Sequence, residues 1–306
     1  MIPPEGRPMR NEAVPATNVP IHRGAVKMIR AVSDLLKTEL PLAAGLCVFA
    51  GEVFALGRLP PLGEALLGFL VGFLLSGAAM ISNDYFDLEV DRINHPERPL
   101  PSGRVSVREA AVLTGLFTVA GLIGAALLGA MALILAIAIW AVGLLYNWKL
   151  KESGLPGNMA VSFSVASTFV FGGLAVGRLG SGLVWTFGAL AFLFDLGEEI
   201  AGGVMDAAGD ALRSARSVAR VHGRKAALGV TGGLFLTFVV VSVLPFFEGW
   251  MGMASFLLLL VADAAVAYLF LRLYGSKTPV EGRKRLRQLY LTMVLVVVAF
   301  IVNVVV

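Results

Sequence analysis

The chain is a succession of long apolar stretches separated by short polar segments. An apolar run of about 20 residues is long enough to cross the hydrocarbon core of a bilayer as a helix. Such stretches occur nine times, at about 38–57, 64–86, 109–129, 131–148, 156–177, 181–201, 226–247, 250–273 and 287–305. The pattern predicts an all-α polytopic membrane protein with nine transmembrane helices.

The boundaries within this pattern predict one membrane domain behind a short tail. Residues 109–148 are almost continuously apolar and long enough for two passes, so we place a turn at Gly129. The first residues carry Arg, Pro and Asn without an apolar run, which predicts a mobile polar tail over 1–25 and not a signal peptide. No segment resembles an interdomain linker, so we expect residues 26–306 to form a single transmembrane domain.

Composition narrows the class of protein further. Of the 306 residues 57% are hydrophobic and 15% are charged, whereas a soluble domain has about 25% charged residues. A soluble globular enzyme, a disordered chain and an ordinary nucleic-acid-binding domain are therefore excluded, despite a net charge of +4. The single cysteine, Cys47, excludes an intrachain disulfide and any CxxC motif.

The basic residues predict the orientation in the membrane. With nine spans, every Lys and Arg except Arg58 and Arg178 falls on the same side. Cytoplasmic loops of membrane proteins carry an excess of Lys and Arg. We therefore expect a multi-pass protein of the cell membrane with its N-terminus and long loops in the cytoplasm.

Acidic side chains first interrupt the apolar pattern at the end of the stretch 64–86. On a continuous helix Asp84, Asp87 and Asp91 lie within an arc of about 60°, with Asn83 beside them. Three neighbouring carboxylates repel one another, and each is costly at membrane depth unless it is paired. A divalent cation removes both penalties, and Mg²⁺ typically takes one or two carboxylates together with waters and phosphate oxygens.

A second acidic cluster follows the stretch 181–201. It consists of Asp195, Glu199, Asp206 and Asp210, which also share an arc of about 60° on a continuous helix. Several glycines between them make that continuity doubtful. Both clusters fall on the cytoplasmic side, and each is followed by a basic loop. Two facing acidic stripes with Arg and Lys around them predict a site for Mg²⁺ and a polyphosphate, although Asp91 or Asp210 alone could be a solvated helix end.

Four further polar residues stand singly in the apolar stretches. They are Glu39, Glu52, Asp263 and Asn303. For each of them we expect hydrogen bonding between helices and not chemistry.

The first acidic motif resembles that of a known family. Asn83-Asp84-x-x-Asp87-x-x-x-Asp91, with the loop 94–103 after it, is similar to the first aspartate-rich motif of the UbiA superfamily of intramembrane prenyltransferases. The resemblance covers about residues 30–300 and continues through 146–151, 157–158 and 199–210. It departs from the family in the second motif, where Glu198 stands at the usual position of an Arg and Gly203 replaces the first Asp.

The resemblance implies a fold, a reaction and roles for the residues. It implies nine helices around a central cavity, and Mg²⁺-dependent transfer of a prenyl group from a polyprenyl diphosphate to a membrane-associated acceptor. The implied metal ligands are Asn83, Asp84, Asp87 and Asp91 on one side and Asp206 and Asp210 on the other, with Glu199 as a further candidate. The candidates to hold the diphosphate are Asn83, the basic residues Arg98, Lys151, Arg213 and Arg216, each of which could instead be a topology charge, and Tyr146, which could instead be an interfacial anchor.

The acceptor is less closely specified. The run 83–106 is most similar to the archaeal lipid branch, so we favour geranylgeranylglyceryl phosphate, with 4-hydroxybenzoate or a related aromatic acid next. We expect a geranylgeranyl donor, membrane lipid as surroundings, no nucleic acid and no obligate protein partner. A cation-coupled secondary transporter that uses the same acidic clusters is the competing interpretation, but transport gives no reason for the basic residues around them.

Overall fold

The computed structural model describes residues 25–210 and 215–306, with all side chains in these ranges except those of 25–28, 94 and 207–210. Every regular element in these ranges is helical. The first half holds α1 (Ala25–Leu36), α2 (Glu39–Leu56), α3 (Leu62–Phe86), α4 (Leu88–Asn94), α5 (Val107–Leu128), α6 (Ala130–Leu145) and the π-helical turn η1 (Tyr146–Leu150). The second half holds α7 (Leu155–Ala175), α8 (Gly182–Asp210), α9 (Val218–Ser242), α10 (Leu244–Phe247), α11 (Met253–Tyr274) and α12 (Pro279–Val305).

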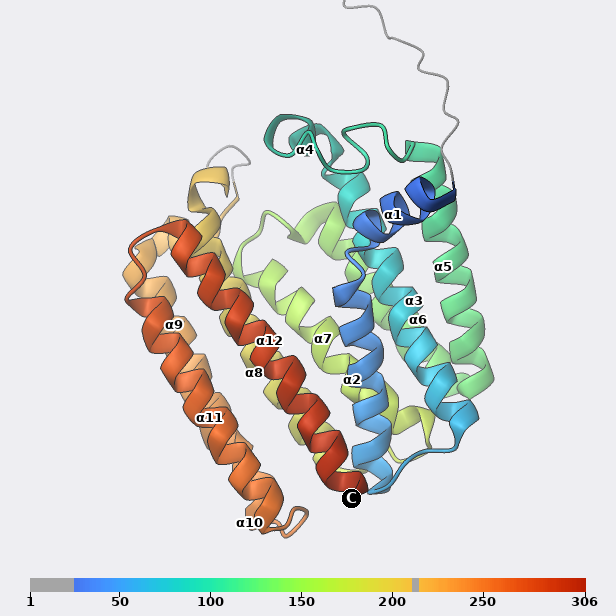
Figure 1. Ribbon diagram of the computed structural model, residues 1–306, viewed down its shortest axis with the longest axis vertical. Helices are drawn as coiled ribbons and strands as arrows, with labels where there is room; N and C mark the ends of the chain where they lie inside the picture. Colours follow the sequence, from blue (N-terminus) through green and yellow to red (C-terminus); the bar gives the residue numbers. More distant parts are fainter. Residues whose placement is uncertain (1–24, 211–214) are drawn as a thin grey trace, which may run out of the picture.

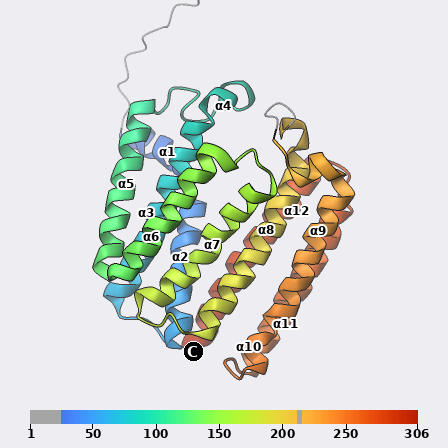
Figure 2. The ribbon, with the colours of Figure 1, turned by 180° about the vertical axis from the view of Figure 1, so that it is seen from behind.

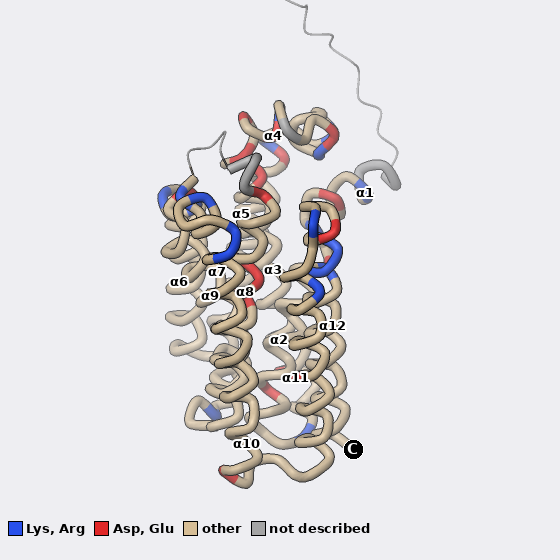
Figure 3. Tube along the Cα trace, turned by 90° about the vertical axis from the view of Figure 1, so that its left-hand side faces the viewer, with Lys and Arg blue, Asp and Glu red and all other residues tan. Residues whose placement is uncertain are grey.

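The long helices stand side by side as a bundle, and the short ones lie at its two ends. α1 and α4 lie at one end, while α10 and the C-terminus lie at the other (Figures 1 and 2). Charged residues gather at the end that carries α1 and α4 (Figure 3). Arg58 follows α2 and Arg178 follows α7, at the opposite end. The bundle therefore has one charged end, as the distribution of Lys and Arg in the sequence predicts.

Within the described part of the chain, eight helices are long and apolar enough to cross a membrane. They match eight of the nine predicted stretches and confirm a polytopic membrane protein. The ninth stretch, 181–201, lies in α8, which is 29 residues long. Three acids, Asp195, Glu198 and Glu199, lower its apolar character, so the nine-span count remains a prediction.

Local signals explain where several helices begin and end. The predicted turn inside 109–148 is present, because Gly129 takes a φ of 124° between α5 and α6. α5 begins at a capping box, in which the Ser106 hydroxyl accepts from the Glu109 N–H and the Glu109 carboxylate accepts from the Ser106 N–H. This box ends the polar loop that follows α4 and starts the next span.

Close backbone contact joins α2 to α7. A Cβ added at Gly51 would lie 2.2 Å from the Phe169 carbonyl oxygen, and one at Gly172 would lie 2.0 Å from the Val48 carbonyl oxygen. Small residues allow such approach between helices in a membrane. These two helices, together with α3, α8 and α12, surround the cavity described below.

The isolated polar residues mostly have the hydrogen bonds that we expect. Asp263 accepts from Ser242 at 2.8 Å, and Asn303 and Ser255 are hydrogen-bonded. Glu39 of α2 accepts hydrogen bonds from Arg287 of α12, with which it also forms an ion pair. The expectation is wrong for Glu52, because it is fully buried and neither of its carboxyl oxygens has a hydrogen-bond partner among the described residues.

Candidate active site

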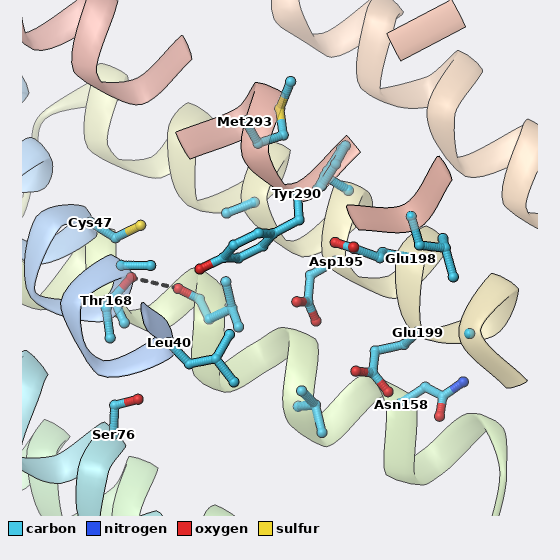
Figure 4. Close-up of a pocket in the computed structure, with 18 of the residues that line it drawn as sticks. Leu40, Cys47, Ser76, Asn158, Thr168, Asp195, Glu198, Glu199, Tyr290 and Met293 are labelled. Carbon is cyan, nitrogen blue, oxygen red and sulfur yellow. Dashed lines mark hydrogen bonds between the residues drawn. The ribbon is translucent and has the colours of Figure 1, made fainter. Parts of the chain in front are cut away.

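A cavity lies among the long helices of the bundle. Its volume is about 990 Å³, and residues of α2, α3, α7, α8 and α12 line it. Figure 4 shows Asp195 and Glu199 of α8 on one side of Tyr290, and Cys47 and Thr168 on the other. Other residues of the lining, among them Phe169, Phe187 and Phe300, are apolar, so the cavity joins an acidic region to an apolar one.

One face of α8 lines both the acidic and the apolar region of the cavity. Its cavity-lining residues follow the three- and four-residue spacing of a helix face: Phe187, Leu190, Ala191, Phe194, Asp195, Glu198, Glu199, Gly202, Gly203 and Asp206. The helix is continuous from Gly182 to Asp210 despite its glycines. This face is apolar at its beginning and acidic in its second half, which fits a ligand with an apolar tail and a polar head.

The first acidic motif lies where α3 ends. Asp87 stands between α3 and α4, and its N–H still donates to the Asn83 carbonyl at 3.0 Å. The Asp91 N–H donates to the Asp87 carbonyl at 2.8 Å, so the helical path is nearly continuous. All three aspartates are buried, and of the three only Asp87 lines the cavity.

Each acid of this motif has a basic partner from another part of the chain. Lys37, between α1 and α2, donates to Asp84 at 2.8 Å. Arg98 donates to Asp91 at 2.6 Å. Lys151, at the end of η1, donates to Asp87 and also to the Asn83 side-chain oxygen. The cations neutralise carboxylates that would be costly to bury alone.

The second wall of the acidic region is formed by α8. Asp206 borders the cavity and is largely exposed, and Arg283 of α12 donates to it at 2.5 Å. Deeper in the cavity, Ser162 of α7 donates to Asp195 at 2.7 Å. Asp210 is the last residue of α8, and its side chain, like Arg213, lies outside the described residues.

The turn η1 and the residue after it place Tyr146 and Lys151 at the cavity. Irregular π-helical turns are frequent at functional sites. Gly154, with a φ of 76°, lets the segment after α8 approach closely, since an added Cβ would lie 2.0 Å from the Arg216 carbonyl oxygen. The Arg216 N–H donates to the Glu152 carbonyl at 2.9 Å. The backbone of Arg216 therefore lies beside the turn that carries Lys151.

The structure brings part of the predicted set to one cavity. Its lining includes Asp87, Tyr146, Lys151, Glu199 and Asp206. Arg98, Asp84, Asp91 and Asn83 lie outside that lining. The Asn83 side chain is hydrogen-bonded to a lining residue, Lys151.

Sequence reasoning missed three charged residues of this region. They are Lys37, Glu198 and Arg283. No signal in the linear sequence separates the two basic residues from ordinary topology charges, because their acidic partners are 47 and 77 residues away.

The donor set fits a magnesium ion that is shared with a phosphate ligand. Carboxylate oxygens are the hard donors that Mg²⁺ prefers, and one or two of them suffice when phosphate oxygens and waters complete the shell. Asp87 and Asp206 offer such oxygens from two helices around one cavity. Among the described residues no three acidic, His or Cys side chains could by themselves hold a metal.

Comparisons with known proteins agree with this geometry. The profile described as the UbiA prenyltransferase family matches residues 44–302. The chain is 33% identical over 274 residues to the digeranylgeranylglyceryl phosphate synthase of Thermococcus kodakarensis, covering 89% of this chain and 97% of the relative. For the enzyme of that name from Methanopyrus kandleri, identity is 37% over 239 residues, covering 78% and 86% of the two chains.

Solved structures have the same fold. A digeranylgeranylglyceryl phosphate synthase structure superposes with a TM-score of 0.75 at 27% identity, covering 91% of this chain and 99% of the other. A UbiA homologue from Archaeoglobus fulgidus bound to DMAPP and Mg²⁺ superposes with a TM-score of 0.69 at 20% identity, covering 90% and 99%. At 20% identity, the similarity to the Archaeoglobus fulgidus structure shows a shared fold and nothing finer.

Proposed function

The chain belongs to the UbiA prenyltransferase family, and from this premise we propose that it transfers a geranylgeranyl group from its diphosphate to geranylgeranylglyceryl phosphate, with Mg²⁺ as cofactor. Family membership makes it an intramembrane prenyltransferase and leaves the transporter interpretation without support. The relatives named above are synthases of the ether lipid precursor that this reaction would yield. For aromatic acids such as 4-hydroxybenzoate as acceptors, support comes only from the family as a whole.

One observation carries the proposal. Asp87 and Asp206, from segments far apart in the sequence, border the same cavity, and another part of that cavity is lined by apolar side chains such as Phe187 and Leu190. A polyprenyl diphosphate has this division into an anionic head and a hydrocarbon tail. The acidic region would take the head with its metal, and the apolar region would take the tail.

The residues of the acidic region have separate roles in this proposal. Asp87 and Asp206 would hold the metal, which, when bound, stabilises the negative charge of the departing diphosphate. Asn83, Asp84, Asp91, Asp210 and Glu199 remain further candidate ligands. Lys151 lies at the cavity and would donate to phosphate oxygens, where donors placed at developing charge act strongly. Arg98, Arg213 and Arg216 remain candidates for the same role.

The surroundings of the site would protect the reaction. An allylic carbocation is captured by water unless water is excluded. The apolar part of the cavity lies inside the bundle, where Phe187 and Phe300 are buried. Tyr146 lies at the acidic end, where its ring face could stabilise positive charge. We further propose that this end of the bundle faces the cytoplasm, as the gathering of Lys and Arg predicts.

The test is a transfer assay with purified protein in lipid vesicles. Geranylgeranyl diphosphate is supplied with Mg²⁺ and with geranylgeranylglyceryl phosphate, 4-hydroxybenzoate or no acceptor, and the products are separated by chromatography. We expect a digeranylgeranyl product, release of diphosphate, and loss of both with EDTA. A prenylated aromatic product alone would overturn the acceptor, and turnover undiminished by EDTA would overturn the role of the metal.

A further inference from the structure

Three aromatic rings lie together in the apolar part of the cavity. Phe169 of α7, Phe187 of α8 and Phe300 of α12 all line it and are all buried. We call these three residues the aromatic floor. Phe187 is its centre, with ring centroids 6.2 Å from Phe169 and 5.3 Å from Phe300. Three of the helices around the apolar region therefore each contribute one ring to the same cluster.

A further ring supports the floor from outside the cavity. Phe54 of α2 is buried but does not line the cavity, and its ring centroid lies 4.4 Å from that of Phe187. The part of α2 that does line the cavity ends at Cys47, about two turns earlier. Interlocked aromatic rings are stabilised by offset and edge-to-face contacts and form a stiff layer. A tail that reaches Phe187 cannot pass without moving these rings.

The distance between the floor and the acidic region defines the length of tail that the cavity can hold. Phe187 and Glu199 lie on one continuous helix and are separated by about 18 Å along its axis, at 1.5 Å per residue. An extended geranylgeranyl chain has a comparable length. Asp206 lies about 28 Å from Phe187 along the same axis. A donor whose diphosphate extends from Asp87 and Asp206 to the level of Glu199 would therefore bring the end of such a chain to the floor.

We propose that the aromatic floor, and Phe187 above all, sets the upper limit on the length of the prenyl donor. The proposal rests on the proposed function, because it assigns the apolar region to the donor tail. Donors up to the geranylgeranyl length fit above the floor, whereas a longer chain must displace Phe187 or fold back on itself. Phe187 is thus a specificity-determining residue and has no part in the chemical step.

Substitutions at Ala191 and at Phe187 move the floor in opposite directions. Ala191 lies one turn from Phe187 toward the acidic region and lines the cavity, so Ala191→Phe raises the floor by about 6 Å. Phe187→Ala lowers it, and Phe187→Leu does so with less disturbance of the packing. Ala189 lies on the exposed face of α8 and does not line this cavity. Ala189→Phe therefore adds the same ring outside the cavity and is the matched control.

The experiment compares geranyl, farnesyl, geranylgeranyl and geranylfarnesyl diphosphates at saturating acceptor. In Ala191→Phe we expect kcat/KM for the geranylgeranyl donor to fall by about 10- to 200-fold relative to the geranyl donor, the range for misfit of an apolar group in a pocket. In Phe187→Leu and Phe187→Ala we expect relative use of the geranylfarnesyl donor to rise about tenfold or more. Ala189→Phe should keep the wild-type order of donors.

The outcomes separate this inference from the proposed function. A folded Ala191→Phe variant with the wild-type preference among donors would overturn the floor and leave prenyl transfer intact. A wild-type protein that transfers no donor would overturn the proposed acceptor reaction. In that case donor binding is measured directly, as the rise in unfolding temperature that each diphosphate causes in the presence of Mg²⁺. Identical rises for all four diphosphates in wild type and Ala191→Phe would then overturn the floor.

Discussion

Lys37 holds Asp84 by an ion pair of 2.8 Å from a backbone conformation that non-glycine residues rarely adopt. Its φ of 48° lies in the left-handed region, and it is the only described residue other than glycine with a positive φ. Such strain persists where the surrounding structure demands it, and it occurs often at functional sites. The turn between α1 and α2 thus places an ammonium group on a carboxylate that is only 3% exposed.

Removal of this ammonium group should destabilise the protein. We expect Lys37→Met to lower the free energy of unfolding by about 1–3 kcal/mol, because Asp84 would be left buried without its cation. Thermal unfolding in detergent would measure the change, and the double variant Lys37→Met/Asp84→Asn should recover part of it. Breaking the exposed pair of Arg104 and Asp34 should cost less than about 1 kcal/mol. An unchanged midpoint in Lys37→Met would contradict the assignment.

Asp87 and Asp206, the two acids that would hold the metal, should both be needed for activity. We expect Asp206→Asn and Asp87→Asn each to lower the transfer rate at least about a hundredfold, since a metal contributes several kcal/mol to such a step. Asp206 is 59% exposed, so its variant should also unfold at the wild-type temperature. Asp34→Asn, an exposed acid of α1, is the control and should remain active. Near-normal turnover in Asp206→Asn would remove that residue from the site.

The contact between α2 and α7 should tolerate no added methyl group. Gly172→Ala would bring a Cβ within 2.0 Å of the Val48 carbonyl oxygen, so the helices must separate, and we expect a loss of about 1–3 kcal/mol. Gly115 lies inside α5 with nothing within 4 Å of an added Cβ. Gly115→Ala should therefore be neutral or should stabilise by about 0.5–1 kcal/mol. Equal unfolding temperatures for the two variants would show that the helices are not in close contact.

Glu52 should be a site where substitution improves stability. Both of its carboxyl oxygens are buried without a hydrogen-bond partner among the described residues, and such groups cost about 1–3 kcal/mol each. We expect Glu52→Met, similar in length and apolar, to raise the unfolding temperature, whereas the exposed Glu248→Met should change it little. A lower midpoint in Glu52→Met would indicate that the carboxyl group has a partner in the membrane.

The sequence predicted the spans well because their signals are local. Runs of apolar residues identify the membrane helices directly, and the break at Gly129 follows from the length of the run around it. The nearly continuous path from Asn83 to Asp91 likewise follows from helical spacing. These features depend only on neighbouring residues.

The arrangement of the site depends on contacts that the sequence does not display. Spacing places Asp84, Asp87 and Asp91 on one face, but only Asp87 lines the cavity, while Asp84 is paired with Lys37 and Asp91 with Arg98. The contact of Arg283 with Asp206 requires α12 to lie beside the end of α8. Burial and long-range pairing are properties of the packed bundle, so periodicity alone cannot provide them.

The uninterrupted course of α8 also limits how proteins of this architecture can diverge. One inserted or deleted residue between Phe187 and Asp206 would rotate everything after it by about 100° and turn the carboxylates away from the ligand. Replacement of a single side chain, by contrast, leaves the apolar and the acidic half of α8 facing the same cavity. Homologues that accept donors of different size are therefore expected to align along this helix without gaps and to differ there by replacements alone.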